Sequence, residues 1–424
     1  MQRPKLSVVL MFVAIATPIP ASDVQAVRAG TLVDVQNGTA LRNQTILIEA
    51  GKVTAIGSDP RVPAGATVID LSDSYVMPGL IDAHTHLCIR TRLEADRLGL
   101  DFLDAVLLDP PGYRGIQGVA YAREMLDAGF TAVRDMGNAG QYVDVDLQRG
   151  IRERLVPGPT MLVAGRIIST FGGQFRARVD RAVLENPEYM FADTHDELRK
   201  AIRENVFYGA NVIKVVADSN RYAYSTEELQ YIVEEARAAG LRTAIHCQTA
   251  TCERRAAEAG PASIEHAWSL EDEETRELIR KNGVVLVTTD ATEAVLRAFG
   301  WDEARAREKH AARVARLQRA HAAGITIAFG SDVMVKVAGH TRGTAAVGYV
   351  VGFVEAGIPA AEILRIFTLN GARLLGIEKE RGSLAKGMAA DLIGMRQDPL
   401  EDPRALTAVD FVMKDGRVHR HDRR

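Results

Sequence analysis

Short apolar runs alternate with amphipathic segments through the middle of the chain. Such alternation is typical of parallel strands joined by crossover helices. Eight apolar runs have the length and residue types of strands: 75–84, 131–135, 160–167, 211–216, 242–246, 262–266, 284–288 and 326–330. A helix is predicted at 226–239, where Thr226 opens a Thr-Glu-Glu-Leu cap and Gly240 marks the end. Eight strands with intervening helices predict an α/β fold, a (β/α)8 TIM barrel, over residues 76–383.

The two ends of the chain have a different pattern. Residues 27–75 are rich in β-branched residues and are broken by turn signals such as Gln36-Asn37-Gly38. Residues 384–424 have the same character. We expect both ends to join in one small β-sandwich domain beside the barrel. The alternative is two unrelated extensions.

Residues 1–26 are predicted to be a secretory signal peptide. Arg3 and Lys5 give a positive start, an apolar stretch follows over residues 6–17, and Val24-Gln25-Ala26 offers small residues for cleavage. A membrane anchor is the alternative, but the apolar stretch is short for a bilayer span. We therefore expect an exported protein, periplasmic or secreted, that starts near Val27 and has no membrane association after signal removal.

Composition and charge exclude some partners. The 424 residues are 47% hydrophobic, enough for a large core, and a net charge of -3 gives no reason to expect a nucleic acid or an anionic membrane. The three cysteines are too few for a disulfide framework. We expect Cys88 and Cys252 to be small buried residues. Cys247 follows a proposed metal ligand on a strand, so its side chain should point into the barrel wall.

Polar side chains stand at the carboxyl ends of the predicted strands, where barrel enzymes carry their chemistry. They are His84, His86, Lys214, His246, His266 and Asp332. Histidines at i and i+2 of an extended chain project from the same side, so both can reach one metal. Taken singly, each residue could be a hydrogen-bonded core residue or a helix cap, and a buried lysine would be costly without a partner. Together at one end of one barrel, they predict a metal centre.

The chain resembles the amidohydrolase superfamily over nearly its whole mature length. The matching segments are 78–86, Lys214, 263–266, 330–332 and 386–392. Within the superfamily, the chain is most similar to the branch of imidazolonepropionase-like proteins and prolidase-like carboxypeptidases. This branch includes amidohydrolases that cut the amide bond of ochratoxin.

The resemblance implies that carbon dioxide carboxylates Lys214 and that the resulting carbamate bridges two divalent metal ions, usually zinc. His84, His86 and Asp332 would complete one site, and His246 and His266 the other. A carbamate gives two dications an anionic bridge, and burial keeps the lysine amine neutral enough to react. Two metals lower the pKa of bound water and polarise a scissile carbonyl. Asp332 would be the catalytic group that moves the proton.

Three other classes compete with this interpretation. A Schiff-base lyase would use Lys214 as its nucleophile but would leave the four histidines and Asp332 unused. A one-metal deaminase of the same superfamily commonly places a glutamate shortly after the strand-five histidine, but here His246 is followed by Cys247-Gln248-Thr249. A non-catalytic relative would be expected to lack ligands. Lactones and carbamate esters remain alternative substrates, because their carbonyls can be attacked in the same way.

The substrate is expected to be a small molecule or a dipeptide-like amide whose leaving amino acid carries a free α-carboxylate, with ochratoxin A as one candidate. Arginine binds carboxylates through two parallel hydrogen bonds. The candidate contacts after strands four and eight are Arg221, Tyr222, His340 and Arg342, and Cys88 is expected in the pocket wall. Relatives often have a histidine where Gln174 stands. The resemblance also implies a homo-oligomer.

Overall fold

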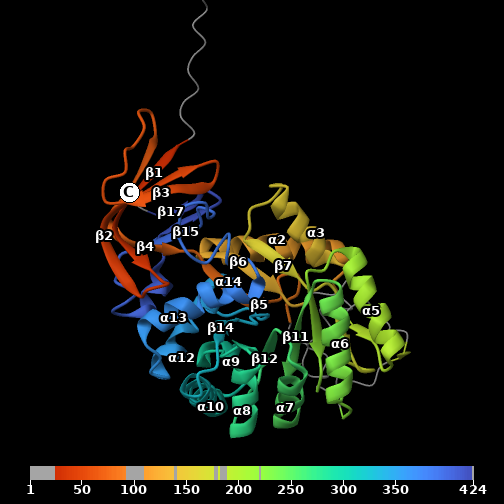
Figure 1. Cartoon of the computed structure of the whole chain (residues 1–424). Coiled ribbons are helices and arrows are strands. Elements are labelled where there is room, and N and C mark those ends of the chain that lie inside the picture. Colours follow the sequence, from red (N-terminus) through yellow and green to blue (C-terminus); the bar gives the residue numbers. More distant parts are fainter. Residues whose placement is uncertain are drawn as a thin grey trace, which may run out of the picture.

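The barrel and a separate mixed sheet are both present in the computed structural model (Figure 1). The structure describes residues 24–91, 109–137, 141–175, 180–181, 189–218 and 221–422. Residues 1–23, most of the predicted signal peptide, lie outside this range. No helix in the described ranges combines the length and the apolar character that a membrane span needs.

Parallel strands form the barrel at eight positions. They are β5 (Leu80–Thr85), β6 (Phe130–Asp135), β7 (Thr160–Val163) continued by β8 (Ile167–Ser169), β10 (Val212–Val216), β11 (Arg242–Cys247), β12 (Ser263–His266), β13 (Val285–Thr288) and β14 (Ile327–Phe329). Asn211 N donates to Val163 O at 2.8 Å, which joins the third strand to the fourth. Asp332 N donates to His84 O at 2.8 Å and closes the ring between the last strand and the first. The predicted barrel is confirmed.

The first predicted strand, 75–84, is in fact two strands in two sheets. Its first part belongs to β4 (Thr67–Pro78), which pairs with the mixed sheet, and its second part is β5. Gly79 lies between them with Thr131 packed where a Cβ would stand, so only glycine fits at this turn. The third predicted strand is also divided, and the short β9 (Tyr189–Phe191) pairs with its second half.

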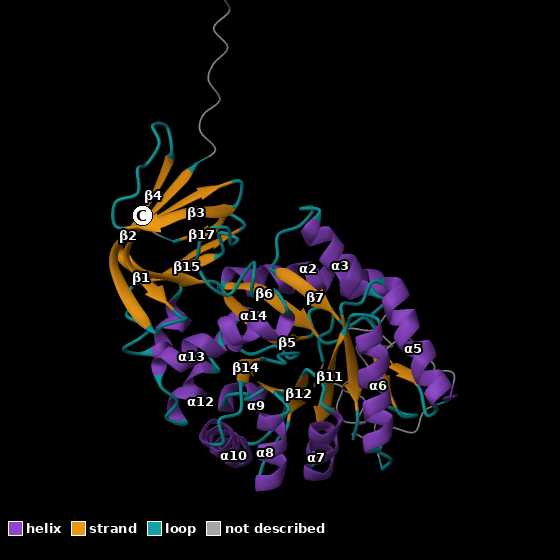
Figure 2. Cartoon of the chain, in the orientation of Figure 1, coloured by secondary structure: helices purple, strands orange, loops and turns teal. Residues whose placement is uncertain are grey.

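Helices cover the outer face of the barrel (Figure 2). They are α2 (Pro111–Asp127), α3 (Val143–Arg152), α5 (His195–Tyr208), α6 (Thr226–Ala238), α7 (Ala250–Ala259), α8 (Glu273–Lys281), α9 (Glu293–Ala298), α10 (Glu303–Ala322), α11 (Arg342–Val347), α12 (Val350–Glu355), α13 (Ala360–Ile366) and α14 (Leu369–Leu375). The predicted helix at 226–239 is α6, but Ser225 rather than Thr226 caps it. The Ser225 hydroxyl accepts from Glu228 N at 3.2 Å, and the Glu228 carboxylate accepts from Ser225 N at 2.8 Å.

Both ends of the chain meet in one mixed sheet of order β17-β16-β15-β4-β1-β2-β3. The other strands are β1 (Gln25–Asp34), β2 (Thr39–Glu49), β3 (Lys52–Gly57), β15 (Leu392–Met395), β16 (Phe411–Lys414) and β17 (Arg417–His421), with a 3-10 turn at Pro403–Ala408. Strands β15 and β4 pair antiparallel and join the two ends, so the expected single domain is confirmed. Ala26 is fully buried and pairs with Leu47, so cleavage after Ala26 would remove the first two residues of β1.

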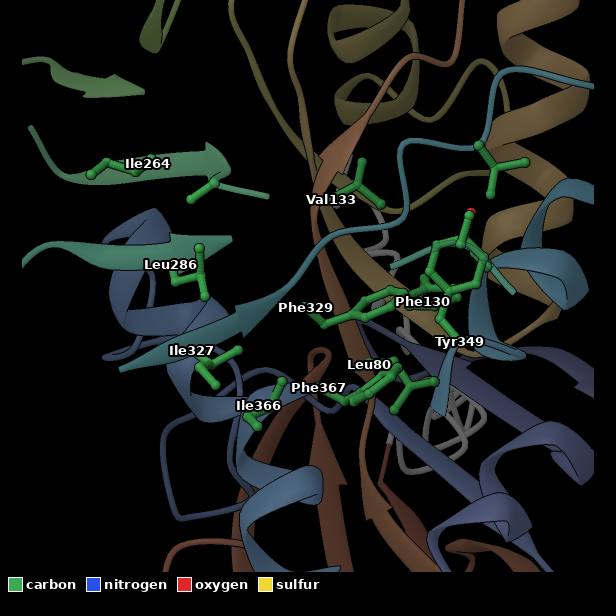
Figure 3. Packing of buried hydrophobic residues seen from close by; sticks show 14 of the residues in the cluster. Leu80, Phe130, Val133, Ile264, Leu286, Ile327, Phe329, Tyr349, Ile366 and Phe367 are labelled. Carbon is green, nitrogen blue, oxygen red and sulfur yellow. The ribbon is translucent and has the colours of Figure 1, made fainter. Parts of the chain in front are cut away.

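The main core lies between the strands and the outer helices. Phe130, Phe329 and Phe367 are fully buried, and the rings of Phe329 and Phe367 stack at 4.1 Å (Figure 3). Burying a phenylalanine stabilises the folded chain by about 1.5–3 kcal/mol. This packing holds the strands whose ends carry the polar residues.

The expectation for the cysteines was wrong in one respect. Cys247 points out of the barrel as predicted, but it forms a disulfide with Cys252 in the first turn of α7. The strand end and the helix start bring the two residues within 5.4 Å between Cα atoms. Cys88 is buried and packs against Gly118 of α2.

Candidate metal centre

The predicted ligands converge at the carboxyl ends of the barrel strands. The imidazole of His84 lies 5.3 Å from that of His86 and 5.0 Å from that of His266, and the rings of His246 and His266 are 4.4 Å apart. Lys214 is buried in β10 and interacts electrostatically with all four imidazoles. Asp332 follows β14 and faces the same space. The structure therefore brings all six residues together.

His84, His86 and Asp332 form a metal-binding group, with one ligand atom from each within 4.8 Å of the others. Asp332 Oδ1 lies 3.3 Å from His86 Nε2 and 3.8 Å from His84 Nε2. This oxygen is buried and accepts no hydrogen bond from any residue that the structure describes. A buried carboxylate oxygen without a donor is costly, whereas a cation between it and two imidazoles would satisfy it. The donor set fits a divalent metal.

A left-handed backbone conformation directs the side chains of two of the six predicted ligands. His266 has φ +70° and Asp332 has φ +54°, both in the left-handed region that residues with a Cβ seldom adopt. Strand alternation alone would send His266 to the face opposite its neighbour Glu265, which points into the barrel. The left-handed turn brings His266 back toward the other imidazoles. Strain of about 1–3 kcal/mol per residue is found where function requires the geometry.

Two histidines have their outer nitrogen fixed by a hydrogen bond. His84 Nδ1 lies 2.7 Å from Glu265 Oε2, and His86 Nδ1 lies 2.5 Å from the carbonyl oxygen of Gly137. Because a carboxylate and a carbonyl only accept, each Nδ1 carries the proton and donates. The Nε2 atoms, which face Asp332, then keep their lone pairs for a metal.

Sequence reasoning missed a buried network behind His84. Glu265 Oε1 accepts from Arg134 at 2.7 Å and from the Ser263 hydroxyl at 2.5 Å, and Arg134 Nε donates to Ala83 O at 2.7 Å. All of these side chains are buried. The sequence did indicate this network, because the charged residues Arg134 and Glu265 stand inside the apolar runs 131–135 and 262–266. This network fixes the position and the protonation of the His84 ring.

A second set of contacts supports His246. Asp218, just beyond β10, accepts from Gln248 N at 2.9 Å and from Thr249 N at 2.8 Å, and Asp218 Oδ1 lies 4.0 Å from His246 Nε2. Together with the disulfide between Cys247 and Cys252, these bonds fix the turn that follows the histidine.

Burial sets the charge of the site. It lowers the pKa of all four histidines, that of His86 to about 3, and the positive charge of Lys214 lowers each further. Burial also lowers the pKa of Lys214, against the opposing charges of Glu265 and Asp332. The imidazoles are thus neutral, as metal ligands must be, and the lysine amine is easier to deprotonate.

The predicted substrate contacts separate into two groups. Arg221, Tyr222 and His340 are exposed, and Tyr222 is 77% exposed. Arg342 does not clamp a substrate as predicted. It is buried, its guanidinium donates to the carbonyl oxygens of His86 (2.5 Å) and Ile89 (2.9 Å), and it covers the ring of Tyr121.

Cys88 is also not a pocket-wall residue. Its side chain is fully buried and packs against Gly118 of α2. Gln174 accepts a hydrogen bond from Tyr189 at 2.6 Å. The assignment of Lys214, His246 and His266 as ligands stays a prediction.

Several known proteins are similar to this chain. Ochratoxinase from Aspergillus niger is 27% identical over an alignment of 436 positions, covering 93% of this chain and 86% of that protein. Its crystal structure superposes with a TM-score of 0.79 at 25% identity, over 94% of this chain and 96% of that one. The crystal structure of a Xaa-Pro dipeptidase with bound methionine gives a TM-score of 0.82 at 26% identity, over 94% of this chain and all of that one.

A deaminase of 5-methylthioadenosine and S-adenosylhomocysteine from Moorella thermoacetica is 25% identical over 421 aligned residues, 90% of this chain and 91% of that protein. The sequence profile of the Amidohydrolase family matches residues 75–419, which include the whole barrel and the metal-binding group. With its barrel, its terminal sheet and its His-His-Asp site, the chain belongs to the amidohydrolase family.

Proposed function

We propose that the chain is a binuclear metal-dependent amidohydrolase that releases an amino acid with a free α-carboxylate from a peptide-like amide. It would act as a carboxypeptidase or an N-acyl amino acid hydrolase, and the amide of ochratoxin A is one candidate substrate. The observation that supports two metals is the position of the buried Lys214, which interacts with all four imidazoles and with Asp332. The similarity to ochratoxinase and to a Xaa-Pro dipeptidase supports the amide.

In this proposal, His84, His86 and Asp332 hold one metal ion and His246 and His266 the other, with zinc as the expected element. Lys214, carboxylated by carbon dioxide, would bridge them. The bound metals supply Lewis acidity and an activated water.

The chain's own residues would do the rest. Asp332 accepts the proton of the attacking water and passes it to the leaving nitrogen. Glu265 and Gly137 keep His84 and His86 in the ligand tautomer.

We also propose that the protein is exported and works as a homo-oligomer on a small-molecule substrate. Arg221, Tyr222 and His340 are exposed and remain candidates to contact the substrate.

Hydrolysis of matched substrates tests the proposed function. Zinc-loaded protein should hydrolyse N-acetyl-L-phenylalanine faster than its carboxamide, because only the first carries the free carboxylate. The value of kcat/KM for N-acetyl-L-phenylalanine should be about tenfold to hundredfold higher than that for the carboxamide. This is the effect expected from one charge-assisted hydrogen bond. Equal rates on both compounds, or hydrolysis of lactones in preference to both, would overturn the proposal.

A further inference from the structure

Arg313 of α10 lies near the metal centre, because the charges of Asp290 and Asp332 both act on it. Its guanidinium carbon lies 6.0 Å from the centre of the Trp268 ring, and that ring meets the His266 imidazole edge-on at 5.9 Å. Arg313 also donates to Ala291 O, in the loop after β13, at 3.3 Å. Arg313 and His266, a proposed metal ligand, therefore pack against the same Trp268 ring.

Arg313 differs from the other arginines near the site. Arg316, one turn further along α10, is fully buried and is bonded to Asp290 and to the carbonyl oxygen of His266. Arg134 and Arg342 likewise donate hydrogen bonds to carbonyl or carboxylate oxygens of the chain. Within the described residues, Arg313 makes a single hydrogen bond and no ion pair, although a guanidinium offers five donors.

The surroundings of Arg313 favour an anion. The side chain is only partly buried, so a ligand can reach it. Burial lowers the pKa of Arg313, and the charges of Asp290 and Asp332 oppose this change. Asp290, which has the larger electrostatic effect on Arg313, is already paired with Arg316. A partly desolvated guanidinium with unused donors is the usual partner of a substrate carboxylate.

We propose that Arg313 binds the free carboxylate of the substrate and that Trp268 forms the apolar wall for the side chain of the leaving amino acid. Trp268 is 42% exposed, so its indole face is open to a ligand. This inference rests on the proposed function and names the residue that selects for the carboxylate. It points to leaving residues with apolar or aromatic side chains.

Kinetics with the matched substrates test the assignment. Arg313→Met should lower kcat/KM for N-acetyl-L-phenylalanine by about tenfold to hundredfold and change the value for the carboxamide by less than about threefold. Arg305→Met is the control, because Arg305 lies exposed on the same helix beside Asp302. It should change neither substrate. Equal losses on both substrates would mean that Arg313 acts through Asp332 or the fold, and would overturn the inference.

A binding measurement separates this inference from the proposed function. Calorimetry would compare L-phenylalanine with L-phenylalaninamide on the zinc-loaded protein, without turnover. If the wild type prefers the carboxylate and Arg313→Met loses that preference, the assignment is supported. If Arg313→Met keeps the preference, only the assignment of Arg313 is wrong. If the wild type has no preference, the carboxylate requirement of the proposed function is itself wrong.

Discussion

Replacing Glu265 with glutamine changes one atom of the network behind His84. Glu265 has two roles at once, because Oε1 accepts from Arg134 and Ser263 while Oε2 accepts from His84 Nδ1. A glutamine has only one acceptor oxygen. The charged Arg134 takes this oxygen, so the amide NH2 turns toward His84. The ring must then accept at Nδ1 and carry its proton on Nε2, the atom that faces Asp332.

The size of the effect follows from this tautomer change. A protonated Nε2 has no lone pair for a metal, so the ring must change tautomer before it binds. This change costs free energy and weakens metal binding. Loss of such a supporting contact typically weakens metal binding by about tenfold to hundredfold, or about 1.4–2.7 kcal/mol. Removing one partner of a buried ion pair also lowers the free energy of unfolding, by about 3 kcal/mol.

Competition with a chelator of known zinc affinity measures the first effect, and nitrogen NMR of the imidazoles reports the tautomer of His84. Asp391→Asn is the matched control. Asp391 is a buried carboxylate in the terminal sheet that pairs with Arg381 and accepts from Asp415 N at 2.7 Å, with no histidine involved. It should lower stability but leave zinc affinity unchanged. Unchanged zinc affinity in Glu265→Gln, or an equal loss in Asp391→Asn, would refute this reasoning.

Other perturbations give distinct results. Lys214→Ala should abolish hydrolysis and lower the metal content, and added short-chain carboxylic acids should restore part of the activity; near-normal turnover and metal content in this variant would exclude a bridging role. Asp332→Asn should abolish hydrolysis while more metal stays bound than in Lys214→Ala, as elemental analysis can check. Replacing both Cys247 and Cys252 with alanine should lower the free energy of unfolding by about 2 kcal/mol in urea titrations, and an unchanged midpoint would mean that the disulfide does not form. N-terminal sequencing from the native host should find a start near Val27, whereas intact Met1 would show that residues 1–26 are not a signal peptide.

The metal centre could be predicted because strand ends in a barrel must meet at one face. His84 and His86 share a strand face, and Lys214 and His246 end up inside the barrel by the same alternation. His266 did not follow from alternation, because its left-handed backbone reverses the direction of the side chain. Its place at a strand end nevertheless puts the His266 ring beside those of His84 and His246, at 5.0 and 4.4 Å.

Other features depend on contacts between distant segments. Arg342 looked like a loop cation, but the start of α11 directs it inward, onto carbonyl oxygens of residues that follow β5. The disulfide needed the relative positions of a strand end and a helix turn, which residue spacing does not give. Arg313 lies in the middle of a polar helix, and only the packing of α10 brings it to the metal centre.

The central claim is a two-metal site, and elemental analysis tests it most directly. Protein purified with zinc and bicarbonate should hold two zinc ions per chain, and activity in a metal titration should reach its maximum only as the second ion binds. Removal of metal by a chelator should abolish activity, and zinc should restore it. Full activity with a single ion per chain would contradict this claim and would favour a one-metal site.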